Sequence, residues 1–94
     1  MARPRLKRRI QFTPKVTSFK PEMLGGDFFD KIELTLEEAE AIRLKNIKGM
    51  DQTEAAKKMK TSQSTFQRIL TSAYKKMSQA LINGHHLTIK ITDN

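Results

Sequence analysis

The sequence predicts a mainly α-helical domain of three helices, the last two forming a helix-turn-helix, with short extended or strand segments at the N- and C-termini. Three observations lead to this fold class. Apolar residues recur at three- and four-residue steps along a long C-terminal segment, capping residues stand before the helical patterns, and a turn of about three residues separates the last two patterns. A chain of 94 residues buries one core and leaves no room for a second.

The first helix is expected over about residues 36–48. Thr35 stands three residues before Glu38, the spacing of a capping box, in which two side chains satisfy free backbone donors at the helix start. The apolar positions at roughly helical spacing are Leu36, Ala39, Ile42 (or Leu44) and Ile47. Asn46 to Gly49 should close the helix, because Gly49 can adopt the left-handed conformation that ends many helices.

A short second helix is expected over about residues 52–59 and a long third one over about residues 63–82. The turn between them comprises Lys60, Thr61 and Ser62, with Ser62 as the N-cap of the third helix. The buried stripe of the second helix consists of Ala55, Ala56 and Met59. The inward face of the third helix consists of Phe66, Ile69, Leu70, Ala73, Met77, Ala80 and Leu81, and Asn83-Gly84 ends it.

The two ends of the chain lack helical periodicity. Residues 1–12 are expected to form a flexible basic arm, because Pro4 favours an extended path and five cations repel one another: Arg3, Arg5, Lys7, Arg8 and Arg9. Residues 13–31 are expected to be irregular, and residues 32–94 to form the helix-turn-helix domain. Alternating apolar residues predict a short strand over about residues 87–91, and residues 9–12 are a candidate for a short edge strand.

Charge is the strongest global feature of the chain. Eighteen Lys and Arg against ten Asp and Glu give a net charge of +8, and a basic surface attracts nucleic acids because contacts with phosphates release condensed counterions. The chain has no cysteine, which excludes disulfides and thiolate zinc sites. No signal peptide or membrane-spanning apolar run is recognisable, so we expect a cytoplasmic location without a membrane partner.

The third helix carries the expected contact surface with double-stranded DNA. With Phe66 and Ile69 facing inward, a rotation of about 100° per residue places polar side chains on the outward face. These side chains suit the major groove, since Gln can pair with adenine and Arg with guanine through two hydrogen bonds. The residues expected to read base edges are Gln63, Ser64 and Arg68, and those expected to contact the DNA backbone are Ser62, Thr65, Gln67, Thr71 and Lys75.

The expected function is sequence-specific DNA binding as a transcription regulator. The basic arm is expected to follow the minor groove or the phosphates. One module contacts little DNA, so useful specificity favours a homodimer on paired half-sites. Two alternatives stay open: a protein-interaction module that engages the transcription machinery, and a non-specific binder of nucleic acid, including RNA. A steep fall of affinity with salt would distinguish DNA binding from a hydrophobic protein interface.

Catalysis, metals and cofactors are not expected. The sequence shows no arrangement for nucleophilic chemistry and no glycine loop that could cradle phosphate. His85 and His86 are interpreted as surface residues at a helix end. Adjacent residues of an extended segment point to opposite faces, so these two side chains do not readily chelate one ion.

Short runs along the chain resemble known families. Those in the helix-turn-helix are Glu54-Ala55-Ala56-Lys57-Lys58-Met59, Thr61-Ser62, Thr65-Phe66 and Arg68-Ile69-Leu70, and they resemble region 4 of the primary sigma factors. Further runs are Arg3-Pro4-Arg5, Arg8-Arg9-Ile10, Phe19-Lys20-Pro21, Leu34-Thr35-Leu36, Glu38-Ala39-Glu40-Ala41-Ile42-Arg43-Leu44, Ala80-Leu81 and Asn83-Gly84. Together they resemble the domain-of-unknown-function 134 family of small bacterial and archaeal proteins, over nearly the whole chain. The resemblance implies a helix-turn-helix protein that binds DNA.

Two positions depart from that family's pattern. Members often carry cysteine in the arm, where this chain has Leu6 and Gln11, so a metal or redox role of the arm is not carried over. The turn usually has glycine where Lys60 stands. If Lys60 must be left-handed, the conformation costs on the order of 1 kcal/mol, which the packing of Met59 and Phe66 could offset.

Overall fold

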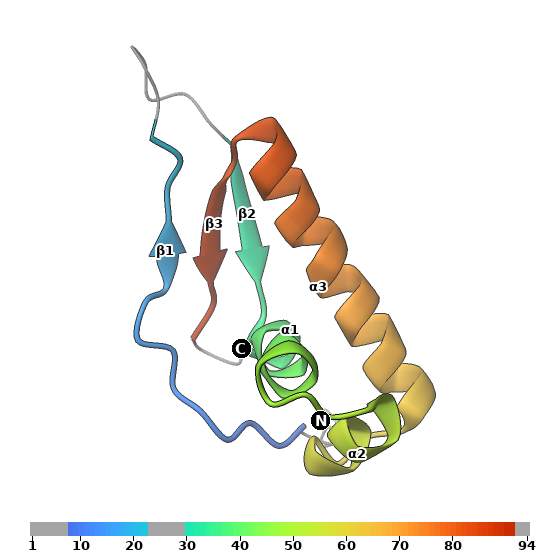
Figure 1. Cartoon of the computed structure of the whole chain (residues 1–94). Coiled ribbons are helices and arrows are strands. Elements are labelled where there is room, and N and C mark those ends of the chain that lie inside the picture. The colour runs from blue at the N-terminus through green and yellow to red at the C-terminus, as the bar shows by residue number, and fades with distance from the viewer. Residues whose placement is uncertain (1–7, 23–29, 92–94) are drawn as a thin grey trace, which may run out of the picture.

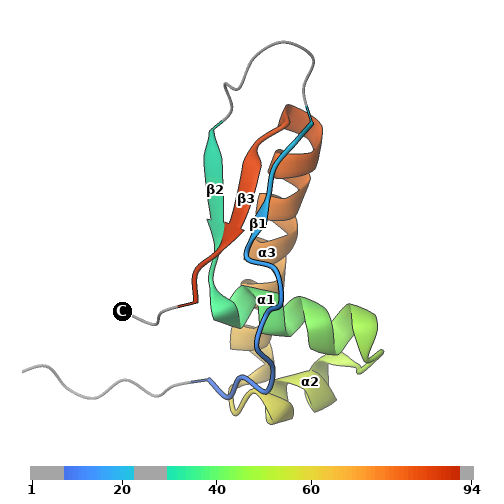
Figure 2. The same cartoon turned by 90° about the vertical axis from the view of Figure 1, so that its left-hand side faces the viewer.

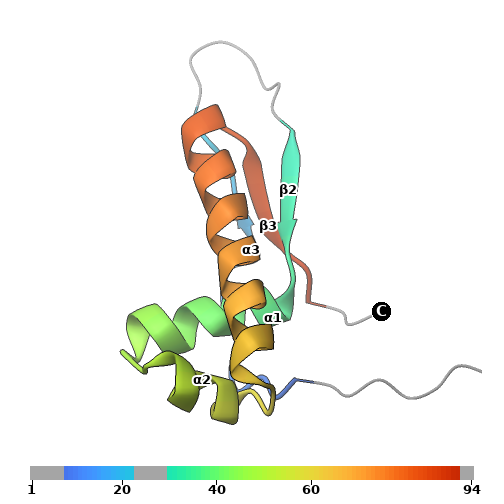
Figure 3. The same cartoon turned by 90° about the vertical axis from the view of Figure 1, so that its right-hand side faces the viewer.

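The structure, a computed structural model, describes residues 8–22 and 30–91. Its longest element, α3 (Gln63–Asn83), runs along the length of the domain (Figure 1). Around the N-terminal half of α3 lie α1 (Leu36–Ile42), its continuation η1 (Arg43–Ile47) and α2 (Gln52–Lys58). A three-stranded sheet lies beside the C-terminal half of α3 (Figure 3). The predicted mainly α fold with short strands is therefore confirmed.

Local capping signals define the start of the first helix, as predicted. Thr35 and Glu38 form a complete capping box, in which the Glu38 amide donates to Thr35 Oγ1 and the Thr35 amide donates to Glu38 Oε1. The helix then widens into the π-helical turn η1, where the Lys48 amide donates to Arg43 O at 2.9 Å. Leu44 is buried, whereas Ile47, the last apolar position of the predicted helical spacing, is 75% exposed.

The helix-turn-helix connection between α2 and α3 also follows the predicted local signals. Asp51 caps α2 by accepting from the Glu54 amide, and Ser62 caps α3 by accepting from the Thr65 amide at 3.1 Å. Lys60 occupies the left-handed region with φ 56°. The Thr61 amide then donates a hydrogen bond to Ala56 O at 3.0 Å, which holds the turn against the end of α2.

The left-handed Lys60 makes the turn a site where glycine should stabilise the fold. We expect Lys60→Gly to raise the free energy of unfolding by about 1 kcal/mol, because glycine has no Cβ to crowd the following carbonyl. Chemical denaturation followed by circular dichroism measures this difference. Gly84→Ala is the opposite control: Gly84 has φ 71°, so its variant should lose a similar amount. A Lys60→Gly variant less stable than the parent would contradict the assignment of strain to this turn.

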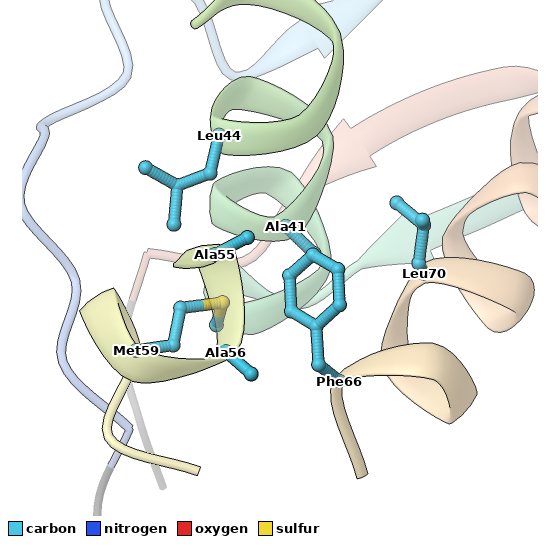
Figure 4. Close-up of a cluster of buried hydrophobic side chains, with 7 residues drawn as sticks. All are labelled: Ala41, Leu44, Ala55, Ala56, Met59, Phe66 and Leu70. Atoms are coloured by element: carbon cyan, nitrogen blue, oxygen red, sulfur yellow. The ribbon is translucent and has the colours of Figure 1, made fainter. Parts of the chain in front are cut away.

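A compact hydrophobic cluster fixes the two helix-turn-helix elements against α1. Phe66 of α3 points between α1 and α2 (Figure 4) and is fully buried, as is Met59 at the end of α2. The small side chains of Ala41, Ala55 and Ala56 allow the helices to approach closely around the Phe66 ring. Leu44 and Leu70 complete the cluster. The predicted stripe of the second helix and the inward position of Phe66 are confirmed.

The small sheet joins segments from both ends of the chain. Its strands are β1 (Ser18–Phe19), β2 (Lys31–Leu34) and β3 (His86–Ile89), in the order β1-β3-β2. The central strand β3 pairs antiparallel with β1 and parallel with β2 (Figure 2). The parallel pairing requires the crossover that α1, α2 and α3 together provide.

The strand predictions need correction. No strand is predicted from the sequence at Lys31–Leu34 and only irregular chain at Ser18–Phe19, whereas both segments are strands. The C-terminal strand begins one residue earlier and ends two residues earlier than the predicted 87–91. The candidate edge strand at 9–12 is wrong, because the Arg9 amide instead donates to Met59 O at 3.0 Å and the Gln11 amide to Glu40 Oε2 at 3.0 Å.

His86 is a buried strand residue, which corrects its interpretation as a surface residue. It is 7% exposed, and its Nε2 lies 2.5 Å from the hydroxyl of Ser18 on β1. Burial lowers the pKa of the His86 imidazole below its usual range, and the positive charges of Lys20 and Lys31 act in the same direction. The pairing of β3 with two other strands, rather than the end of α3, therefore determines the surroundings of this histidine.

The C-terminal half of α3 is less buried than predicted. Ala73 and Ala80 face the interior, but Met77 is 38% exposed and Leu81 is 80% exposed. The prediction that Leu81 faces inward is therefore wrong. The same prediction for Met77 holds only in part, because more than one-third of this residue is exposed. None of the helices in the described part of the chain is long and apolar enough to cross a membrane.

Candidate nucleic-acid interface

The first three turns of α3 present a polar face away from the core. This face consists of exposed side chains that are expected from the sequence to contact DNA: Gln63, Ser64, Gln67, Arg68, Thr71 and Lys75. Opposite them, Phe66 and Leu70 are buried in the core cluster. The side chains of Gln63, Arg68 and Lys75 make no hydrogen bond or ion pair with any other residue in the ranges 8–22 and 30–91. These groups are therefore available to an external ligand.

Some residues expected to contact DNA already make hydrogen bonds within the protein. The hydroxyl of Ser62 accepts from the Thr65 amide and lies 2.9 Å from Thr65 Oγ1, so both side chains stabilise the start of α3. Gln67 bonds to Gln52 of α2 and donates to Thr71 Oγ1 at 3.0 Å. Gln67 therefore links α3 to α2. This contact could not be predicted from the sequence, because Gln52 lies on a different element.

A buried carboxylate sets the position of α3 relative to α1. Glu38 is 6% exposed and accepts from Ser72 Oγ at 2.5 Å and from Lys76 Nζ at 2.8 Å, both on α3. Lys76 also donates to Glu33 O on β2 at 2.8 Å. One acid thus caps α1 and orients the helix that carries the polar face. Only the capping role could be predicted from the sequence, since the residues of α3 that contact Glu38 are distant from it along the chain.

The same network perturbs the titration of Glu38. Burial raises the pKa of this carboxyl, but hydrogen bonds from Lys76, Ser72 and the Thr35 amide outweigh burial, so the pKa lies below its usual range. A lowered folded-state pKa means that the fold favours the carboxylate. This contribution to stability is complete above the ordinary glutamate pKa and is lost as the pH falls through the lower folded value.

The described end of the basic arm lies against the helix-turn-helix. The Arg9 amide donates to Met59 O at the turn, and the Arg43 guanidinium lies 5.2 Å from the centre of the Phe12 ring. Arg8 Nε lies 3.4 Å from Glu37 Oε2. Residues 8–12 are therefore docked rather than free. Arg3, Arg5 and Lys7 lie outside the described residues.

Further cations surround the turn beside this polar face. Lys57, Lys58 and Lys60 are all exposed at the end of α2 and in the turn that follows. Arg9 is also exposed, and its backbone is fixed to the same turn. These three lysines are not among the site residues predicted from the sequence. Their position immediately before the capped helix is the signal that could have indicated them.

The comparison with known proteins identifies the family. A family model described as "Protein of unknown function DUF134" matches residues 1–94. The chain belongs to the DUF134 family. Its relatives include a UPF0251 protein of Halothermothrix orenii, 45% identical over 93% of this chain, and one of Clostridium novyi, 47% identical over 95%. This chain spans 64% and 60% of the lengths of these two relatives, and no solved structure matches it.

In this DUF134 protein the polar face, the cations and a helix start meet at one end of the molecule. The first backbone amides of α3 carry the positive end of the helix dipole. One of these amides, that of Thr65, donates its hydrogen bond to the side chain of Ser62. Lys57, Lys58 and Lys60 add positive charge on one side of this helix start, and Arg68 and Lys75 project from the helix itself. Such an arrangement can bind a polyanion and can present hydrogen-bonding groups to base edges.

Proposed function

We propose that this DUF134 protein binds double-stranded DNA sequence-specifically, with the N-terminal half of α3 in the major groove, and regulates transcription. The observation that carries the proposal is the exposed face of α3 with unengaged Gln63 and Arg68 side chains, held rigidly by the buried Phe66 on the opposite side. The activity is binding rather than catalysis. It belongs in the cytoplasm, the location predicted from the sequence.

Different groups of the interface have different roles in this proposal. Gln63, Ser64 and Arg68 read base edges, with Arg68 donating two hydrogen bonds to a guanine. Thr71 and Lys75, one turn and two turns further along α3, contact the DNA backbone. The lysines at the α2–α3 turn and the basic arm add contacts with phosphates, which give affinity without sequence information. This division predicts different consequences for substitutions in the two groups.

The test is selection of binding sites from random duplex DNA at two salt concentrations, with Arg68 variants in parallel. We expect Arg68→Ala to relax the preference at one base pair by about 1–3 kcal/mol, or roughly 5- to 150-fold. Arg68→Lys keeps the charge but not the planar fork, so it should keep the overall affinity and lose the preference. Lys31→Ala, which removes an exposed cation from the sheet, is the control and should leave the preference unchanged.

The outcomes separate the proposal from its alternatives. A motif that the parent enriches and Arg68→Ala loses supports base readout by α3. Salt-sensitive binding without any motif would reduce the function to non-specific nucleic-acid binding. Absence of binding at both salt concentrations would contradict the proposal and leave protein interaction as the better hypothesis. An unchanged ranking of sites in Arg68→Ala would contradict the placement of α3 in the groove.

A further inference from the structure

An open apolar groove of about 890 Å³ lies beside the C-terminal half of α3 and is lined by residues other than those of the polar face. Its walls come from the C-terminal half of α3, from η1, and from Phe12, Phe19 and the sheet residues Leu87 and Ile89. On α3 the wall consists mainly of Tyr74, Met77 and Leu81, which are spaced i, i+3 and i+7 and therefore form one stripe along the helix. The core of this domain does not use that stripe.

The residues around this groove expose a large apolar surface. Leu81 is 80% exposed, Ile47 75% and Phe19 51%, and Tyr74 and Met77 are each more than one-third exposed. Together the five expose on the order of 500 Å², which is the size of the largest apolar patch on a typical monomer, and such patches are often interaction sites. A stable interface buries roughly 800 Å² on each partner, so this patch supplies more than half of one.

The charge pattern indicates which partner can cover the groove. The chain carries a net charge of +8, so two copies repel each other wherever their charged surfaces meet. The last two turns of α3, residues 77–83, contain no charged side chain. Arg43 on the opposite wall is neutralised by Glu40, which accepts two hydrogen bonds from it at 2.7 and 3.1 Å. Lys20 is a further cation of the groove lining. Two copies that meet here therefore bring few like charges together, and the stripe of Tyr74, Met77 and Leu81 carries none.

We propose that a second copy of this chain covers the groove and that the protein is a symmetric dimer. Leu81 projects from the stripe beside the groove, so under a two-fold axis the stripe of each copy enters the groove of the other. Tyr74, Met77 and Leu81 of one copy then pack against the wall that includes Ile47 of its partner. Both copies use the same surface, as a closed dimer requires.

This arrangement also suits a DNA-binding protein, a point that rests on the proposed function whereas the dimer itself does not. Leu81 and the base-reading residues lie about 22 Å apart along α3, because a helix rises about 1.5 Å per residue. Two such arms that meet near Leu81 span at most about 44 Å between their reading ends, which includes the roughly 34 Å of one turn of DNA. A dimer contact at the groove is therefore compatible with two half-sites one turn apart.

Sedimentation equilibrium of the full chain over a range of concentrations tests the proposal. We expect the parent to be a dimer that dissociates on dilution. Leu81→Glu places a charge on the stripe and should raise the dissociation constant of the dimer about a hundredfold or more. Ile47→Glu, on the opposite wall, should act in the same way. Both positions are at least three-quarters exposed, so the thermal stability of the diluted monomers should stay unchanged.

Ile82→Glu is the matched control. Ile82 is 78% exposed and follows Leu81 directly, but it does not line the groove, so this variant should remain dimeric. A parent that is monomeric at every concentration overturns the proposal. It is likewise overturned if the dimer survives Leu81→Glu and Ile47→Glu, or if Ile82→Glu disrupts it equally strongly. A dimer that binds no DNA would contradict the proposed function alone, and a monomer that selects a DNA motif would contradict the dimer alone.

Discussion

Replacing Phe66 with alanine should lower the free energy of unfolding by about 3–5 kcal/mol, the usual range for a buried phenylalanine. The ring is fully buried where α1, α2 and α3 meet, and its neighbours Ala41, Ala55 and Ala56 are too small to fill the cavity that remains. Small domains are stable by only about 5–15 kcal/mol. We therefore expect Phe66→Ala to lose a large fraction of the stability of the domain.

Urea denaturation followed by circular dichroism measures this loss. Ile82→Ala removes a large apolar side chain from the same helix, but Ile82 is 78% exposed, so its variant should change stability by less than about 0.5 kcal/mol. The Phe66 variant should lose DNA affinity for all sequences alike, since α3 and its polar face are no longer fixed against α1 and α2. A loss of under about 1 kcal/mol would mean that α3 does not depend on this ring for its position.

Glu40→Ala should destabilise the protein by about 2–4 kcal/mol, because it leaves two partners of a fully buried carboxylate without an acceptor. Arg43 donates to this carboxylate through two nitrogens, and the Gln11 amide donates to Glu40 Oε2 at 3.0 Å. The hydrogen bonds with Glu40 raise the pKa of the Arg43 guanidinium further above its usual value. Removal of Glu40 returns this pKa toward the usual value, at which arginine is still charged, so the variant leaves a cation without its partner.

The N-terminal segment gives this prediction a second readout. Without Glu40 the Gln11 amide should exchange its hydrogen faster, and proteases should cleave near residues 8–12 more readily than in the parent. Glu37→Ala is the control, because Glu37 pairs with Arg8 at 3.4 Å in a partly exposed position and should contribute less than about 1 kcal/mol. Equal losses in the two variants would contradict the special role of Glu40.

The helices of this domain could be predicted because their signals are local. Thr35 with Glu38, Ser62 with the Thr65 amide, and the left-handed Gly84 at the end of α3 each act within a few residues. The strands could not be predicted equally well. β2 spans only Lys31–Leu34, and its pairing partner β3 lies near the other end of the chain, so no short window of sequence contains the reason for either strand.

The candidate site was predictable to a similar extent. Helical periodicity placed Ser64, Arg68 and Lys75 on the exposed face, where the structure has them. It could not show that Gln67 bonds to α2 or that Glu38 holds α3, because those contacts join distant elements. It also placed Leu81 inward, since an apolar stripe looks the same whether it is buried in its own chain or left exposed.

The position of β3 in the middle of the sheet has a consequence for the order of events during refolding. The cluster around Phe66 uses only residues 41–70, so its contacts are local and can form early. The sheet forms later, because Thr88 of β3 pairs with both Ser18 and Glu33, and closing such long loops costs more entropy. We expect amides of the helix-turn-helix to become protected from hydrogen exchange before those of the three strands when the unfolded chain refolds.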